Sequence, residues 1–132
     1  MELSLGHYGL GTTVRDELLM LQPDFVSNAY ILAYMYATMG GIDWVQSTGW
    51  SDTGDACDMH GVDCLFVNLL HSLSLPNNNL VGTIPDIIGR MKGIRTLDLS
   101  NNKGITGTIP SSLASMTSLD VLDLSGSSLT GT

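Results

Sequence analysis

The sequence predicts an α/β solenoid, a stack of coils that a helical cap closes on its amino-terminal side. Three observations predict it: a frame of 24–25 residues recurs in the second half, its leucines alternate as in a short strand, and the first half differs in charge. The expected organisation is an extension at residues 1–12, a capping domain at 13–64 and repeats at 65–132. Two repeats are complete and the third is truncated.

Composition excludes several classes of protein. Five Lys and Arg stand against thirteen Asp and Glu, which gives a net charge of −8, and 43% of the 132 residues are hydrophobic. That apolar content argues against a disordered chain, and the excess of acids argues against nucleic acid or an anionic membrane as partner. The chain has no apolar run of about 20 residues, so no transmembrane segment is expected. Residues 1–10 lack a signal-peptide core, so the signal of an exported protein would not be in this chain.

The first half reads as a helical cap, because the end of a solenoid exposes apolar surface that must be covered. Thr13 is suited to cap a short helix that runs through Leu21 and stops at Pro23. A second helix is expected from Asp24 to Met39, with Gly40-Gly41 as its left-handed exit. The side of this helix expected to face the core carries Phe25, Ala29, Leu32 and Tyr36.

The second half repeats itself. The segment LHSLSLPNNNLVGTIPDIIGRMKG begins at Leu70, IRTLDLSNNKGITGTIPSSLASMTS begins at Ile94, and LDVLDLSGSSLTGT begins at Leu119. Alternating leucines predict a short strand with one buried face in each unit. Asn78 and Asn102 follow at equal offsets, where a buried amide would satisfy backbone groups of the turn. Each unit buries one apolar side only when the units stack.

The frame LxxLxLxxNxLxGxIPxxL at residues 70–88 and 94–113 resembles the plant-type leucine-rich repeat of receptor ectodomains, polygalacturonase-inhibiting proteins and repeat proteins of microbial eukaryotes. The segment LAYMYATMGGIDWVQSTGW at residues 32–50 is similar to the amino-terminal cap of such proteins. The resemblance implies a right-handed solenoid that recognises other molecules and catalyses no reaction.

Cys57 and Cys64 bracket the segment DMHGVD. The family cap reads Cys-x-Trp-x-Gly-Val-x-Cys, so Gly61 and Val62 match while Met59 replaces the Trp. In that family the two cysteines form a disulfide, which would imply an oxidising compartment here. A metal pair and a redox pair are the alternatives. Zinc needs four ligands, and His60 is the one further ligand nearby.

No catalytic or metal-binding constellation is expected, and no cofactor. The acids Asp52, Asp55, Asp58 and Asp63 lack the order of a calcium loop, so a solvated loop is the better interpretation. The three histidines lie in unrelated contexts, and no nucleophile motif occurs. Tyr30 and Tyr34 are expected in the core of the helical region.

The remaining candidate is a surface. In a leucine-rich repeat the residues that flank the buried leucines point to the concave face. Here these flanking residues are Ser72, Ser74, Pro76, Thr96, Asp98, Ser100, Val121, Asp123 and Ser125. The strip is polar and aligns two acids, but it contains no Trp, Tyr or Arg, the side chains that dominate binding hot spots. A solvated face and a somewhat acidic docking strip are therefore both open.

The leading hypothesis is a non-catalytic recognition module of a secreted or cell-surface protein, with a protein, a peptide or a cell-wall glycan as its partner. One alternative is a structural accessory subunit packed onto a larger assembly, and another is the sensor fragment of a receptor kinase. The cut in the third frame predicts that Leu122, Leu124 and Leu129 are partly uncovered. If the cysteines are reduced, the lumen of an organelle or an intracellular location is the alternative.

Overall fold

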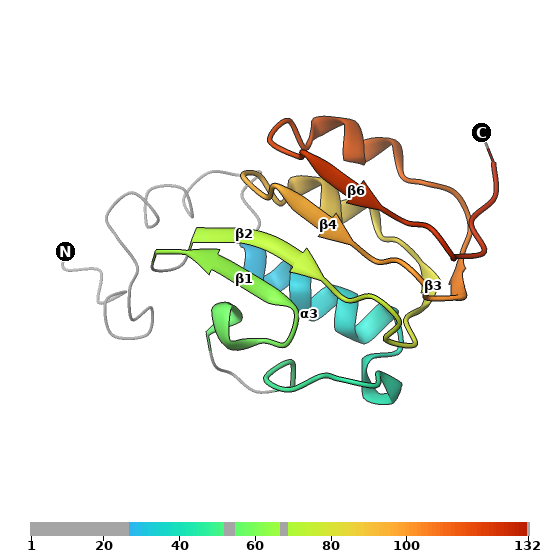
Figure 1. Ribbon diagram of the computed structural model, residues 1–132, viewed down its shortest axis with the longest axis horizontal. Coiled ribbons are helices and arrows are strands. Elements are labelled where there is room, and N and C mark those ends of the chain that lie inside the picture. The colour runs from blue at the N-terminus through green and yellow to red at the C-terminus, as the bar shows by residue number, and fades with distance from the viewer. Residues whose placement is uncertain (1–26, 52–54, 67–68, 132) are drawn as a thin grey trace.

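The computed structural model describes residues 27–51, 55–66 and 69–131 (Figure 1). The helix α3 (Asn28–Thr38) comes first. Four 3-10 helices follow along the chain, and they are η1 (Gly41–Asp43), η2 (Ala56–Asp58), η3 (Asp86–Arg90) and η4 (Ser111–Ser115). The strands are β1 (Val62–Leu65), β2 (Leu69–Ser74), β3 (Val81–Thr83), β4 (Thr96–Asp98), β5 (Gly104–Thr106) and β6 (Val121–Asp123). The predicted extension 1–12, the predicted helix over 13–21 and Phe25 lie outside the described residues.

Local capping sets the bounds of α3. The Ser27 hydroxyl accepts the backbone N–H of Tyr30 at 3.1 Å, which satisfies one of the free donors at the helix start. Gly40 then takes the left-handed conformation, with φ of 74°, and ends the helix as the Gly-Gly pair predicted. The helix ends at Thr38, one residue before the predicted end. No described helix is long and apolar enough to cross a membrane.

The buried side of α3 differs from the predicted one. Ile31, Leu32, Met35 and Met39 are fully buried, whereas Ala29 is exposed and Tyr36 is only half-buried. The prediction was right for Leu32 and wrong for Ala29. The helix is apolar all round, so its periodicity does not indicate which side packs inward.

One sheet runs through the repeats in the order β1-β2-β4-β6. The strands β2, β4 and β6 are parallel, and β1 pairs antiparallel with the outer edge of β2. Leu73 is in register with Leu97, and Leu97 with Leu122, so the predicted vertical alignment of these leucines is confirmed. A second, smaller sheet pairs β3 with β5 in parallel, and α3, η3 and η4 lie behind the larger sheet (Figure 1).

A single apolar core joins the helical region to the repeats. Its fully buried members include Leu32 of α3 and Leu73 and Leu97 of the strands. Trp44 and Trp50 pack edge to face, with ring centroids 4.9 Å apart. Each indole N–H has a backbone acceptor at 2.8 Å, the carbonyl of Met39 for one and that of His60 for the other. The two rings thus form an aromatic wall within this core, and their polar atoms are satisfied.

The asparagines lie where the repeat frame predicted them. Asn102 is 1% exposed, and its side chain accepts the backbone N–H groups of Asn78 and Leu80 of the preceding repeat at 2.8 and 3.0 Å. Its amide nitrogen donates to the carbonyl of Leu75 at 2.9 Å. Asn78 forms the same kind of link with the backbone of Gln46, at 2.7 and 2.9 Å, so the two asparagines connect consecutive layers.

The third frame departs from this pattern. Ser127 stands at the position of the two asparagines, three residues after the second strand leucine. Its hydroxyl donates to the carbonyl of Leu124 at 2.9 Å, within its own repeat. The hydrogen bonds between the second and third layers include the ladder of β4 and β6 and, further along, those of Ser128 and Thr130, whose N–H groups donate to the carbonyls of Ile105 and Gly107.

Candidate recognition surface

The outer face of the four-stranded sheet carries two rows of side chains, of which all but Val121 are polar. Ser72, Thr96 and Val121 are in register across β2, β4 and β6. Ser74, Asp98 and Asp123 form the second row. The predicted alignment of the two acids is therefore confirmed, since they lie on neighbouring parallel strands. Strand alternation directs these side chains away from the buried leucines.

The third set of predicted residues follows the strands. Pro76 and Ser125 are exposed, whereas Ser100 is buried, with 6% of its surface exposed. The carbonyl of Ser100 accepts the backbone N–H of Asn77 at 2.8 Å and the side-chain N–H of Asn102 at 3.2 Å. Ser100 thus belongs to the turn between layers, and the surface consists mainly of the other predicted residues.

Each of the two acids has a structural task in its own turn. The Asp98 carboxylate accepts the backbone N–H of Ser100 at 2.9 Å, and Asp123 accepts that of Ser125 at 3.0 Å. In the first repeat Pro76 takes the serine's place, and it has no N–H to satisfy. Ser74 accordingly replaces the acid there. One oxygen of each carboxylate, Oδ1, thus closes a turn.

The turn that follows β6 lowers the pKa of Asp123. The Ser125 hydroxyl donates to it at 2.6 Å, in addition to the backbone N–H. These two hydrogen bonds, the hydroxyl's first, hold the pKa of Asp123 below its ordinary value. The sheet face therefore keeps a negative charge at β6 in mildly acidic solution.

An ion pair extends the face and was missed in the sequence. Arg95 and Asp120 pair through the Arg95 Nε and Nη2 atoms, and the Asp120 contact of Nε is 2.7 Å. Both residues lie just before β4 and β6, one frame apart. The backbone N–H groups of Asp120 and Val121 also donate to the carbonyl of Arg95 at 2.8 and 3.0 Å. The signal that could have found the pair is the opposite charge at one frame position in consecutive repeats.

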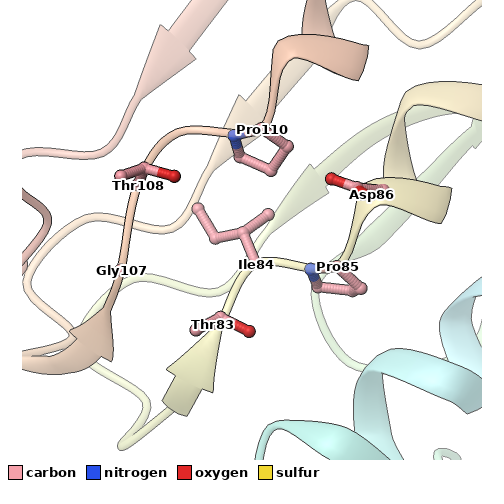
Figure 2. A pocket seen from close by; sticks show the side chains of 7 residues that line it. All are labelled: Thr83, Ile84, Pro85, Asp86, Gly107, Thr108 and Pro110. Carbon is pink, nitrogen blue, oxygen red and sulfur yellow. The ribbon is translucent and has the colours of Figure 1, made fainter. Parts of the chain in front are cut away.

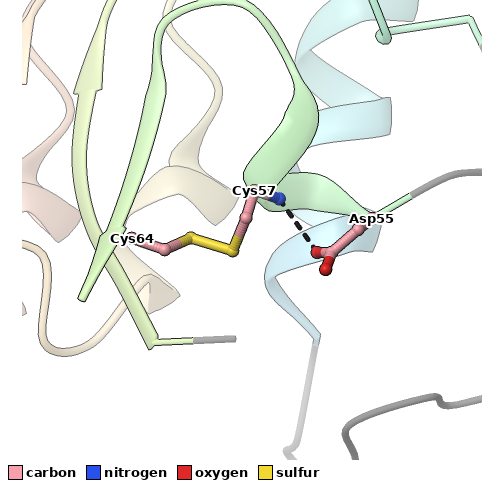
Figure 3. Close-up of a disulfide and its surroundings, with 3 residues drawn as sticks. All are labelled: Asp55, Cys57 and Cys64. Carbon is pink, nitrogen blue, oxygen red and sulfur yellow. Dashed lines mark hydrogen bonds between the residues drawn. A yellow bond between two sulfur atoms is a disulfide. The ribbon is translucent and has the colours of Figure 1, made fainter. Parts of the chain in front are cut away.

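Cys57 and Cys64 form a disulfide (Figure 3). The bond ties η2 to β1, and the Asp55 carboxylate caps η2 by accepting the N–H of Cys57 at 2.9 Å. Of the predicted acidic loop, Asp52 lies outside the described residues. In the part of the chain that the structure describes, no three His, Cys, Asp or Glu side chains gather as a metal site.

Tyr30 and Tyr34 lie on the surface, so the prediction that they pack in the core was wrong. Their exposed fractions are 56% and 42%, and their rings stack with centroids 6.4 Å apart. The core side of α3 is filled by Ile31, Leu32 and Met35 instead. Burying a tyrosine requires a partner for its hydroxyl, and the aliphatic side chains fill the core without that need.

The comparisons with known proteins agree with this geometry. Residues 68–129 match the family model described as a leucine rich repeat. No curated protein matches the chain. Among solved structures, the BIR2 ectodomain from Arabidopsis thaliana is 26% identical with a TM-score of 0.65, and the match covers 80% of this chain and 58% of that one. The chain thus spans less than two thirds of that ectodomain.

Two further structures are similar. The ectodomain of the Arabidopsis receptor kinase HAESA, in complex with an N-terminally extended IDA peptide hormone ligand, is 27% identical with a TM-score of 0.61. The match covers 77% of this chain and 17% of that one. A plant ice-binding protein has a TM-score of 0.70 at 23% identity, over 82% and 35% of the two chains, and shares the fold. With the registered leucines and the buried asparagines, these matches show that residues 68–129 are leucine-rich repeats, and that the chain is similar to plant receptor ectodomains.

Proposed function

We propose that the chain is a non-catalytic recognition module of a secreted or cell-surface protein, and that it binds a peptide or a protein segment. The binding surface is the outer face of the sheet β1-β2-β4-β6, the concave face of a right-handed superhelix. The observation that carries the proposal is the registered pair Asp98 and Asp123, beside Thr96 and Val121 on the same strands. An extended ligand laid across the strands meets these side chains in turn.

The similar structures support a ligand of this class. HAESA, which matches over 77% of this chain, is described in complex with a peptide hormone. The face here is acidic and bears half-exposed hydroxyls, so a peptide with basic or hydrogen-bond-donating side chains complements it. A neutral cell-wall glycan would use the same hydroxyl and carboxylate acceptors.

The domain organisation of this proposal keeps residues 13–64 as the cap and 65–132 as the repeats. The core that α3, Trp44 and Trp50 share with the first repeat supports it, since this wall covers the apolar end of the stack. The disulfide supports an oxidising compartment, such as the cell exterior or the lumen of an organelle.

Selection from a phage-displayed peptide library on the immobilised full chain tests the proposal. Enriched peptides are then titrated calorimetrically against two single variants. Thr96→Arg places a bulky cation in the centre of the sheet face and is expected to weaken binding at least tenfold. Thr117→Arg adds the same side chain at an exposed turn after η4 and is expected to leave the affinity unchanged. Equal effects of the two variants, or no enriched peptide at all, would count against the sheet face.

The runner-up is a structural subunit packed onto a larger assembly, with the sensor fragment of a receptor kinase as a third candidate. The observation that favours the runner-up is Leu122, which is 42% exposed although its partners Leu73 and Leu97 are fully buried. A neighbour that covers Leu122 would protect it from hydroxyl-radical labelling. Protection on assembly, together with an absence of peptide binding, would favour this role.

A further inference from the structure

A second surface lies on the other side of the molecule, where α3 meets η3. The outward side of α3 carries Tyr30, Ala33, Tyr34 and Ala37, all exposed, and no charged residue. The two tyrosine rings stack on each other at the surface. Exposed tyrosines are uncommon away from binding sites and are enriched among the anchors of interfaces. This side of α3 therefore has the composition of a contact surface.

Tyr34 borders a hollow of about 470 Å³, whose other lining residues are Thr38, Thr83, Pro85, Asp86 and Ile87. A second hollow, of about 380 Å³, shares Thr83, Pro85 and Asp86 and continues to Gly107, Thr108 and Pro110. Figure 2 shows the side chain of Ile84 directed from the first Ile-Pro step toward Pro110 of the second. We call the two hollows together the lateral groove.

The lateral groove has one charge. Among the described residues that line it, Asp86 alone is ionisable as an acid or base at neutral pH. Its side chain is exposed, and it makes no ion pair with any described residue. The backbone carbonyl of Asp86 accepts the Ser112 hydroxyl at 2.7 Å, which joins the floor of the groove to the next repeat.

Charge complementarity selects the occupant. The chain has a net charge of −8, the groove holds an acid, and a tyrosine ring stands at its rim. A guanidinium or ammonium group is attracted both to a carboxylate and to the face of an aromatic ring. The floor between them, formed by Pro85 and Ile87, suits the aliphatic stem of such a side chain.

We propose that the lateral groove docks an extended basic peptide, with an Arg or Lys side chain held between the Tyr34 ring and the Asp86 carboxylate. Pro85 and Pro110 lie along the groove and contact the flanking residues of the peptide. This surface is separate from the outer face of the sheet, because α3 and η3 lie behind that sheet (Figure 1). It gives the module a second ligand site.

The test uses the full chain and a dye-labelled eight-residue peptide of alternating Arg and Pro, read by fluorescence anisotropy at low salt. A preformed extended peptide loses little entropy on binding. Tyr34→Ala is expected to weaken binding about fivefold, the size of an exposed cation–π contact with its flanking area. Tyr34→Phe keeps the ring and is expected to stay within about twofold. Asp86→Asn is expected to weaken binding about threefold.

Matched variants separate the groove from general attraction to an acidic chain. Asp58→Asn removes the same charge at an exposed position of η2, so it is expected to bind the Arg-Pro peptide as tightly as the unmodified chain. Equal weakening by Asp58→Asn and Asp86→Asn would overturn the proposal, as would full binding by Tyr34→Ala. Tight binding of the Glu-Pro counterpart would do the same. A dimer in sedimentation that Tyr34→Ala dissolves would assign the groove to a second copy and also overturn it.

Discussion

The side-chain oxygen of Asn102 accepts the backbone N–H of Asn78, one repeat earlier, at 2.8 Å. With its other contacts Asn102 makes five hydrogen bonds, whereas Asn78 makes two through its side chain. Asn102→Ala leaves several buried backbone groups without partners and is expected to lower the free energy of unfolding by about 3–5 kcal/mol.

The matched variant for this prediction is Asn78→Ala, which removes two bonds and is expected to cost about 2 kcal/mol. Urea denaturation followed by circular dichroism measures both. Lys103→Ala, an exposed neighbour, is expected to stay within about 0.5 kcal/mol. A larger loss for Asn78→Ala than for Asn102→Ala would contradict the assignment of the main link to Asn102.

The disulfide between Cys57 and Cys64 predicts a redox dependence of stability. The bond closes a short loop, because the two residues are separated by 7 positions, and loop closure contributes about 2.5 kcal/mol on the chain-entropy model. Reduction, or the double variant Cys57→Ser with Cys64→Ser, is expected to lower the free energy of unfolding by up to that amount. Thiol labelling under native conditions should find no free thiol, and two after reduction. As a control, the melting temperature of the double variant should not change when reductant is added. Labelling of both cysteines of the unmodified chain without reductant would refute the oxidised state.

Alanine substitutions at two glycines with nearly the same φ distinguish the cost of a left-handed backbone from the cost of a steric clash. Gly61 and Gly93 have φ of +88° and +85°, but a Cβ at Gly61 would stand 2.4 Å from the Ser74 carbonyl, whereas at Gly93 nothing lies within 4 Å. Gly93→Ala is expected to cost about 1–2 kcal/mol for its left-handed backbone. Gly61→Ala adds the clash and is expected to cost about 3–4 kcal/mol in total. Thermal unfolding measures both, and equal costs would show that β1 moves away from β2 without penalty.

The Ser125 hydroxyl controls the charge of Asp123. Ser125→Ala removes the first of the two hydrogen bonds that lower the pKa of Asp123, so that pKa is expected to rise toward its ordinary value of 3.8. In the unmodified chain the ionised carboxylate stabilises its turn above the unfolded pKa, and this stabilisation is lost as the pH falls through the lowered folded pKa. NMR titration of the side-chain carboxyl carbon measures the change. Ser72→Ala, two strands away, should leave the titration of Asp123 as it is.

The repeats were predictable because their signal is redundant. Leu73, Leu97 and Leu122 each appear in the same frame, and the buried asparagines follow at a fixed offset, so one fold satisfies every copy. The register of Asp98 and Asp123 followed from the same frame. The cysteine pairing came from the resemblance to a family, since the spacing alone left a metal or redox pair open.

The helical region was less predictable. The helix α3 is apolar all round, so its pattern does not distinguish the exposed Tyr30 and Tyr34 from the buried Ile31 and Met35. The buried side is selected by what lies opposite, the aromatic wall and the first repeat, which are distant in sequence. The lateral groove was missed for the same reason, because Tyr34 and Asp86 meet only after the chain has turned back on itself.

The replacement of asparagine by Ser127 makes the two seams of the stack differ in how far their hydrogen bonds are shielded from water. Between the first and second coils the buried side chain of Asn102 accepts the N–H of Asn78 and donates to the carbonyl of Leu75. Between the second and third coils the hydrogen bonds of Ser128 and Thr130 lie at the surface. Water competes with the outer seam more readily than with the inner one. Hydrogen exchange is therefore expected to be slower at the N–H groups of Asn78 and Leu80, which donate to the buried Asn102, than at those of Ser128 and Thr130.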